Sequence, residues 1–308
     1  MSKYLDPKAD LVFKKVFGQH KNLVQSLLNA LLPLPDKMQI EEVEYLTPEN
    51  IPENPAKKYS IVDVRCTDNY GRHFIVEMQS YWTQEFFSRT VFNAAVVYAN
   101  QLGKGISFME LKDVYALSLV NEESFCFSND DDCIQEYYLT NKKHTEDIHT
   151  NISLVFVELP KFKPSNKGDK VMKNLWLKFL TEIDENTIDA APELLENKEI
   201  SEALEIVRTT SYTTGEMVAY QKYWIDISTE KAAFQGQYQR GIAKGIAEGE
   251  KIGIEKGRVE GKAEGIAEAE SRAYHEKLEN AQKMKSDGLP IETIAKYTNL
   301  TIAEIQNL

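Results

Sequence analysis

Residues 59–81, YSIVDVRCTDNYGRHFIVEMQSY, decide the fold of this chain. Two segments within this stretch, 59–67 and 73–81, have the length of strands and are rich in β-branched and aromatic residues. The residues between them, Asp68-Asn69-Tyr70-Gly71-Arg72, have the composition of a turn. We therefore predict a β-hairpin centred on Tyr70.

Successive side chains of a strand point to opposite faces, so the hairpin predicts which residues lie together. The first strand has an apolar face formed by Val62, Val64 and Cys66. Its other face carries Asp63. On the second strand, Glu77 and Gln79 point away from the face of Phe74, Val76 and Met78. In a hairpin centred on Tyr70 the numbers of paired residues sum to 140, which places Asp63 directly opposite Glu77.

Two opposed carboxylates on one face, with Cβ atoms about 4.5–5.5 Å apart, repel each other and destabilise a sheet. A divalent cation removes this conflict, and hard oxygen ligands with open positions suit Mg²⁺. Gln79 shares the face and is placed to orient a water molecule or a phosphate oxygen. The alternative is an exposed polar face on which Arg65, Arg72 or a lysine pairs with each acid.

The segments around the hairpin alternate between helical and strand patterns. Apolar residues recur with helical spacing over 9–32, 83–103 and 168–233. Strand patterns occur at 114–120 and 151–159, with another candidate strand at 39–46. This order predicts an α/β fold with a mixed central sheet flanked by helices.

The C-terminal part has a different composition. Glycine recurs at every fourth position from Gly241 to Gly265, in segments rich in Ala, Ile, Glu and Lys. Each glycine destabilises a helix by about 1 kcal/mol relative to alanine, so a function is expected for this glycine stripe, the glycines from Gly241 to Gly265. We expect a helical arm through which the chain associates with itself; the alternative is a loosely ordered spacer. Short helices are expected at 290–298 and 301–308. We expect them to form a helical cap rather than a DNA-binding helix-turn-helix.

The ordered motifs resemble those of PD-(D/E)XK nucleases. An acid on one strand, Asp63, is followed by Glu77-Met78-Gln79 on the next. A leading helix carries Asp10 ahead of Phe13-Lys14, and a following helix carries Arg89. The set is most similar to the recombination-promoting nucleases and related transposases of that superfamily. The resemblance implies a restriction-endonuclease-like core. Because aromatic residues nearly vanish after about residue 235, we expect this core over residues 1–235, an extended helical arm over 236–282 and a short helical segment over 283–308.

The resemblance further implies Mg²⁺-dependent hydrolysis of DNA phosphodiesters, linked to transposition or recombination. Asp63 and Glu77 would hold the metal together with the main-chain carbonyl of Met78, and Asp10 would be an outer carboxylate. The alternative for Asp10 is an ordinary ion pair with Lys14, one helical turn later. Arg89 would contact the scissile phosphate or support Asp63. Two positions depart from the motif, because Val62 replaces its proline and Gln79 replaces the lysine of many such nucleases. A neutral amide lacks the electrostatic help of a cation, so a catalytically inactive DNA-binding or assembly protein is the alternative function.

Composition and charge limit these functional predictions. The formal net charge is −12 and the pI about 5.1, so a basic groove for DNA would have to be local. The candidate residues for such a groove are Lys14, Lys15, Lys21, Arg65, Arg72 and Arg89. Three cysteines without a C-x-x-C pair fit free thiols in a reducing compartment. No run of about 18 apolar residues occurs, and the first residues lack the apolar core of a secretory signal. We therefore expect a cytoplasmic protein without a membrane span.

Overall fold

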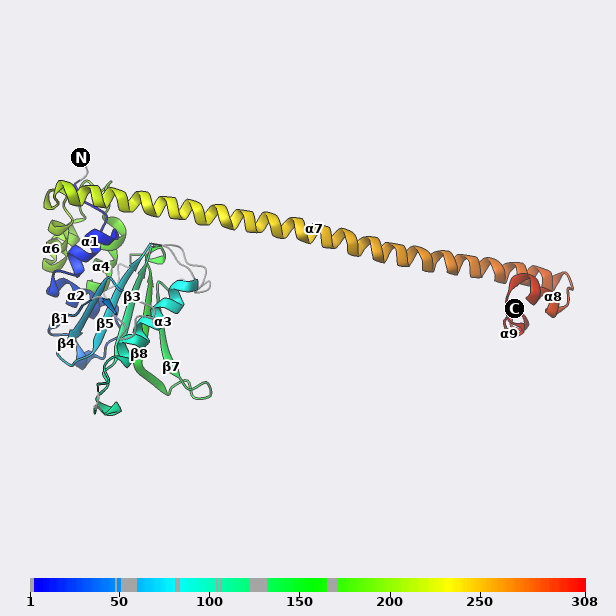
Figure 1. Cartoon of the computed structure of the whole chain (residues 1–308), viewed down its shortest axis with the longest axis horizontal. Coiled ribbons are helices and arrows are strands. Elements are labelled where there is room, and N and C mark those ends of the chain that lie inside the picture. Colours follow the sequence, from blue (N-terminus) through cyan, green and yellow to red (C-terminus); the bar gives the residue numbers. More distant parts are fainter. Residues whose placement is uncertain are drawn as a thin grey trace. The chain divides into compact units, whose positions relative to one another are not determined.

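A computed structural model describes residues 3–47, 49–50, 60–80, 84–103, 105, 107–121, 132–164 and 171–308. Its centre is a six-stranded mixed sheet with the order β1-β4-β5-β6-β8-β7 (Figure 1). The strands are β1 Val43–Tyr45, β4 Val64–Asp68, β5 His73–Gln79, β6 Val114–Val120, β7 Ile134–Thr140 and β8 Ile148–Glu158. β6 pairs in parallel with both β5 and β8, and the remaining pairs are antiparallel. The predicted mixed sheet is therefore confirmed.

The hairpin of β4 and β5 has the predicted register, with Val64 opposite Val76. Gly71 has a φ of +77°, a conformation that few other residues adopt, which explains the glycine in this turn. Asp68 and Arg72 fasten the turn through a buried ion pair with a 2.6 Å contact. The main-chain N–H of Arg72 also donates to Asp68 Oδ1 at 2.9 Å. The turn is thus closed by charge as well as by backbone geometry.

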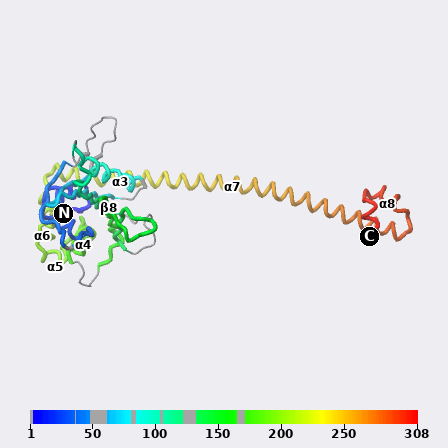
Figure 2. Tube along the Cα trace, turned by 90° about the horizontal axis from the view of Figure 1, so that it is seen from below, coloured from blue at the N-terminus to red at the C-terminus, as the bar shows by residue number. Residues whose placement is uncertain are grey.

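Helices cover both faces of the sheet (Figures 1 and 2). They are α1 Asp10–Phe17, α2 Lys21–Leu31, α3 Gln84–Ala99, α4 Val171–Glu182, α5 Pro192–Glu196 and α6 Lys198–Ile206. One face of the sheet packs against α1, α2, α4 and α6 in the larger core, which includes Phe13, Leu27, Val76 and Trp176. The other face packs against α3 in a smaller core. The strand β5 consequently lies between α1 on one side of the sheet and α3 on the other.

Short elements complete the description. A separate two-stranded sheet joins β2 Glu49–Asn50 and β3 Ser60–Ile61. Single turns of 3₁₀-helix occur at Asp36–Met38, Phe108–Glu110, Leu159–Lys161 and Thr209–Ser211. Among the described residues, no helix combines the length and the apolar character that crossing a bilayer requires.

Two segments differ from the sequence-based expectations, whereas the described part of 168–233 is helical as expected and contains α4, α5, α6 and the start of α7. The helix expected over 9–32 is two helices, because it breaks between Phe17 and Lys21 around Gly18, a poor helix former. The strand β7 was not predicted. It lies at the edge of the sheet and is largely exposed, so its sequence lacks the alternation of a half-buried strand.

The chain divides into two compact units, Met1–Thr229 and Glu230–Leu308. The helix α7, Thr214–Ser286, begins in the first unit and ends in the second. In the second unit its last turns pack with α8 Ile291–Thr298 and α9 Ile302–Gln306. This small core contains Ala281, Ile294, Leu300 and Ile305. Thr301 and Glu304 form a capping box that starts α9, and the predicted terminal helices are confirmed.

Candidate active site

Asp63 lies at a bend where the β4–β5 ladder ends. The last pair of the ladder is Val64 with Val76, so β5 continues through Glu77, Met78 and Gln79 without a β4 partner. Asp63 Oδ2 accepts a 2.7 Å hydrogen bond from the main-chain N–H of Met78. The Asp63 side chain thus accepts the hydrogen bond that a neighbouring strand would accept if the pairing continued.

The bend also changes the side-chain alternation. Val62 was expected on the same face as Val64, but it belongs to the smaller core beside Ile75, on the α3 side of the sheet. Val64 belongs to the larger core on the opposite side. The strand rule of alternate faces fails here because Asp63 is not in an extended, paired strand.

Glu77 is the most enclosed acid of the site, with 7% of its side chain exposed. It points to the α3 side, where Asn93 Nδ2 donates to its Oε1 at 2.9 Å. Its other oxygen, Oε2, lies 3.8 Å from Arg89 Nη2 and accepts no hydrogen bond from the described residues. A buried carboxylate oxygen without a hydrogen bond is costly, and it has the chemistry of a metal ligand.

Burial destabilises the charged form of both acids. It is the main reason that the pKa of Asp63 is raised, and the negative charge of Asp10 adds to the effect while Met78 N–H and Lys14 oppose it. Burial likewise raises the pKa of Glu77, with a contribution from the charge of Asp63 and opposition from Arg89 and Asn93. The two carboxylates therefore interact, and a cation between them would relieve both burial and repulsion.

Lys14 connects the first helix to this pair. Its ammonium lies 2.7 Å from Asp10 Oδ1, one helical turn earlier, and 3.6 Å from Asp63 Oδ1. Burial lowers the pKa of Lys14, but the hydrogen bond to Asp10 and the charge of Asp63 outweigh it and raise the pKa overall. Asp10 is thus both a helix-pair partner and a neighbour of Asp63, the two roles that the sequence left open for it.

Gln79 and Arg89 form a second polar pair. Arg89 Nη2 donates to Gln79 Oε1 at 2.8 Å, in addition to its ion pair with Glu77. The sequence-based expectation gave Arg89 either a phosphate contact or a supporting role at Asp63. The structure places it against Glu77 and Gln79, where it supports the second strand of the hairpin.

The expected metal ligands are compatible with a divalent cation. In a strand, the N–H and C=O of one residue point to the same edge. The Met78 N–H points to Asp63, so the Met78 carbonyl faces that edge as well. Among the described residues, no group of three or more His, Cys, Asp or Glu side chains could hold a metal. Two carboxylates and a carbonyl nevertheless suit Mg²⁺, which retains several waters.

Two further residues of the site have little signal in the sequence. Asn93, fully buried, lies one turn after Arg89 on α3, and only its polarity on an apolar helix face marks it. Tyr223 comes from the first turns of α7, and its hydroxyl lies 2.8 Å from Ser80 Oγ, directly after Gln79. A contact across 143 residues leaves no local pattern that would predict it.

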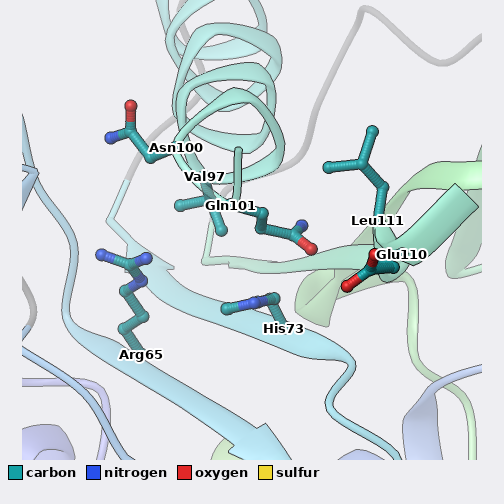
Figure 3. Close-up of a pocket in the computed structure, with 7 residues that line it drawn as sticks. All are labelled: Arg65, His73, Val97, Asn100, Gln101, Glu110 and Leu111. Carbon is teal, nitrogen blue, oxygen red and sulfur yellow. The ribbon is translucent and has the colours of Figure 1, made fainter. Parts of the chain in front are cut away.

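The other basic residues proposed for a DNA groove are dispersed. Arg72 is committed to the buried pair with Asp68. Lys15 pairs with Glu216 on α7. Arg65 lines a cavity of about 300 Å³ at the start of β5, together with His73 and the last turns of α3. Figure 3 shows the side chains of Arg65 and His73 rising from the strands toward that helix. Within the part of the chain that the structure describes, the cations that lie at the carboxylates are Lys14 and Arg89.

Comparison with known proteins identifies the family to which the chain is similar. Residues 7–232 match the family described as PD-(D/E)XK nuclease family transposase, which covers more than half of the chain. Neither a curated protein nor a solved structure matched the chain.

Proposed function

The chain belongs to the PD-(D/E)XK nuclease family of transposases, and from this premise we propose that it is an endonuclease that hydrolyses DNA phosphodiesters with the help of a divalent cation. Membership implies DNA binding and a nuclease-associated role in transposition. The proposal adds the reaction itself, the dependence on a cation such as Mg²⁺, and the residues that carry them.

A single observation carries the proposal: two acids, both largely withdrawn from water, meet at the open end of β5. Glu77 retains an oxygen without a hydrogen bond from the described residues, and Asp63 is held beside it by Met78. A fold keeps two interacting buried carboxylates at a cost in stability. Such perturbed pairs are concentrated at functional sites.

Asp63, Glu77 and the Met78 carbonyl would hold the cation. When bound there, it would lower the pKa of a coordinated water and neutralise charge on the phosphate. Asn93 fixes the Glu77 carboxylate, and the Met78 N–H fixes Asp63, so both acids are oriented before substrate arrives. Gln79, itself oriented by Arg89, would hold a water or a phosphate oxygen.

Nicking of supercoiled plasmid in Mg²⁺, compared with EDTA, tests the proposal. Asp63→Asn and Glu77→Gln keep the shape of each side chain and remove its charge, so we expect both to abolish nicking. Glu44→Gln is the matched control, because Glu44 is an exposed acid on β1 of the same sheet. Equal nicking by wild type and both acid variants, or no nicking by any, would contradict the proposal.

The second candidate function is an inactive nuclease fold that binds DNA. The neutral Gln79 in place of a lysine favours it, because the residue lacks a cation's stabilising charge. Binding of a labelled duplex with Ca²⁺ present, combined with no nicking in Mg²⁺ or Mn²⁺, would support this alternative instead.

We also propose that the helical arm associates with a second copy of the chain. A Cβ built on each of the glycines from Gly241 to Gly265 meets nothing within 4 Å, so the stripe is open. Exposed isoleucines directly follow several of these glycines: Ile242, Ile246, Ile254 and Ile266. Small residues permit close approach of two helices, and the isoleucines offer apolar surface to bury.

Substitutions within the intact chain test this assembly. One variant replaces Gly249, Gly253 and Gly257 with Ala, and a second replaces the same three glycines with Gln. Both replacements raise the helix propensity of the arm. We expect the Ala variant to remain associated and the bulkier Gln variant to dissociate, measured by light scattering. Circular dichroism checks that helix content does not fall. A monomeric wild type, or equal association of the Gln variant, would rule the arm out as an interface.

A further inference from the structure

Lys14 brings an ammonium group to the carboxylates from outside the strand motif. It lies on α1, on the opposite side of the sheet from Arg89 and Asn93 of α3. Its Nζ is 2.7 Å from Asp10 Oδ1 and 3.6 Å from Asp63 Oδ1. Its side chain is 41% exposed, so the ammonium is in contact with solvent as well as with the two acids.

This position differs from that of a surface helix pair. An ordinary Asp–Lys pair one turn apart contributes a few tenths of a kcal/mol and leaves the lysine directed along its own helix. Lys14 instead reaches an acid on another element, 49 positions later in the chain, which is itself held by Met78. The ammonium is therefore directed to the place where the hairpin strand ends.

The site requires a positive charge such as the Lys14 ammonium. Gln79, at the position where many related motifs carry lysine, is neutral and is hydrogen-bonded to Arg89. Arg89 is itself occupied with Glu77 and Gln79 on the α3 side. On the Asp63 side, Lys14 is the cation in ion-pair contact among the residues that the structure describes. A lysine ammonium is a compact charge on a flexible stem, so it can leave Asp10 for a nearby phosphate oxygen.

We propose that Lys14 is the catalytic ammonium of this site, which contacts the scissile phosphate and stabilises the charge that develops on it. The inference rests on the proposed nuclease function. In the hydrolysis, a water oxygen bonds to phosphorus and the bond from phosphorus to one sugar oxygen breaks. The departing oxygen gains a proton, and the second water proton passes to solvent from the new phosphomonoester. Lys14 stays protonated throughout and acts only through charge and hydrogen bonding.

Three variants separate this role from a structural one. Lys14→Met removes the charge and keeps the length of the chain, Lys14→Arg keeps the charge, and Lys198→Met is a control on the exposed first turn of α6. Single-turnover nicking by Lys14→Met should fall by at least about 100-fold. Lys14→Arg should retain at least about one tenth of the wild-type rate, and Lys198→Met should match the wild type.

Metal binding without DNA is the second readout. Luminescence of Tb³⁺, displaced by Mn²⁺, should show equal or tighter binding to Lys14→Met, because a competing cation beside Asp63 has been removed. Nicking by Lys14→Met at the wild-type rate would overturn the inference while leaving the proposed function standing. Loss of Tb³⁺ binding together with activity would also overturn it, since Lys14 would then support the fold of the site. A wild type without any nicking overturns the proposed function, and this inference with it.

Discussion

The main-chain N–H of Met78 donates a 2.7 Å hydrogen bond to Asp63 Oδ2, so the strand that carries the second acid also holds the first. Asp63 is outside the paired ladder, which ends at Val64 and Val76. Its position therefore depends on this hydrogen bond and on the bend, not on strand pairing. The backbone of β5 therefore positions both carboxylates of the pair.

The hydrogen bond predicts a difference between two substitutions of Asp63. Asn retains an oxygen that can accept from Met78, whereas Ala leaves the N–H without its partner. We expect Asp63→Ala to be less stable than Asp63→Asn by about 1 kcal/mol. Urea unfolding in EDTA measures this, and both variants should lack nicking. Equal stability of the two would show that the hydrogen bond contributes nothing to the fold.

Removal of the buried charge at Glu77 should stabilise the metal-free protein. Burial, with the charge of Asp63, raises the pKa of Glu77 in the folded state above its ordinary value of 4.5. The folded protein thus holds this proton more tightly than the unfolded one. The contribution of Glu77 to the free energy of unfolding is therefore most favourable below about pH 4.5, decreases as pH rises through the raised pKa, and is constant above it.

Glu77→Gln lacks this titration and should gain about 0.5–2 kcal/mol over wild type at neutral pH in EDTA. The advantage should vanish at acidic pH, where wild-type Glu77 is protonated. Denaturant unfolding across pH measures both effects. A variant that is less stable at neutral pH, or an advantage that grows on acidification, would show that burial does not destabilise the charged acid.

Gln79 and Arg89 should act as one unit, because Arg89 orients the Gln79 amide at 2.8 Å. Loss of either partner removes the oriented pair, so Gln79→Ala and Arg89→Ala should each lower nicking by about 10-fold or more. The double variant should be little worse than either single one, a non-additive double-mutant cycle. Additive losses would mean that the two residues act separately.

The hydroxyl of Tyr223 should support the site from α7. It lies 2.8 Å from Ser80 Oγ, so Tyr223→Phe removes a fixed contact next to Gln79. We expect a loss of about 0.5–1.5 kcal/mol in stability and a several-fold lower nicking rate. Tyr238→Phe, at an exposed position of the same helix, is the control and should change neither. Identical behaviour of the two variants would exclude a role for this contact.

Several features of this protein were determined by the sequence alone. Strand-length β-formers around Asp68–Arg72 gave the hairpin, and its turn gave the register that pairs Val64 with Val76. The order of helix and strand patterns gave a mixed sheet between helices. The motif residues from Asp10 to Arg89 gave the family that residues 7–232 match. These features depend on local periodicity and turn chemistry, which neighbouring residues encode.

Only the tertiary structure decided which side chains surround the carboxylates. Lys14 reaches Asp63 because α1 packs on one face of the sheet, and Asn93 reaches Glu77 because α3 packs on the other. Tyr223 meets Ser80 because α7 begins beside the end of β5. The bend at Asp63, which moves Val62 to the opposite core, also follows from a long-range choice of hydrogen-bond partner. Packing of distant elements selects these contacts, and no local pattern carries that information.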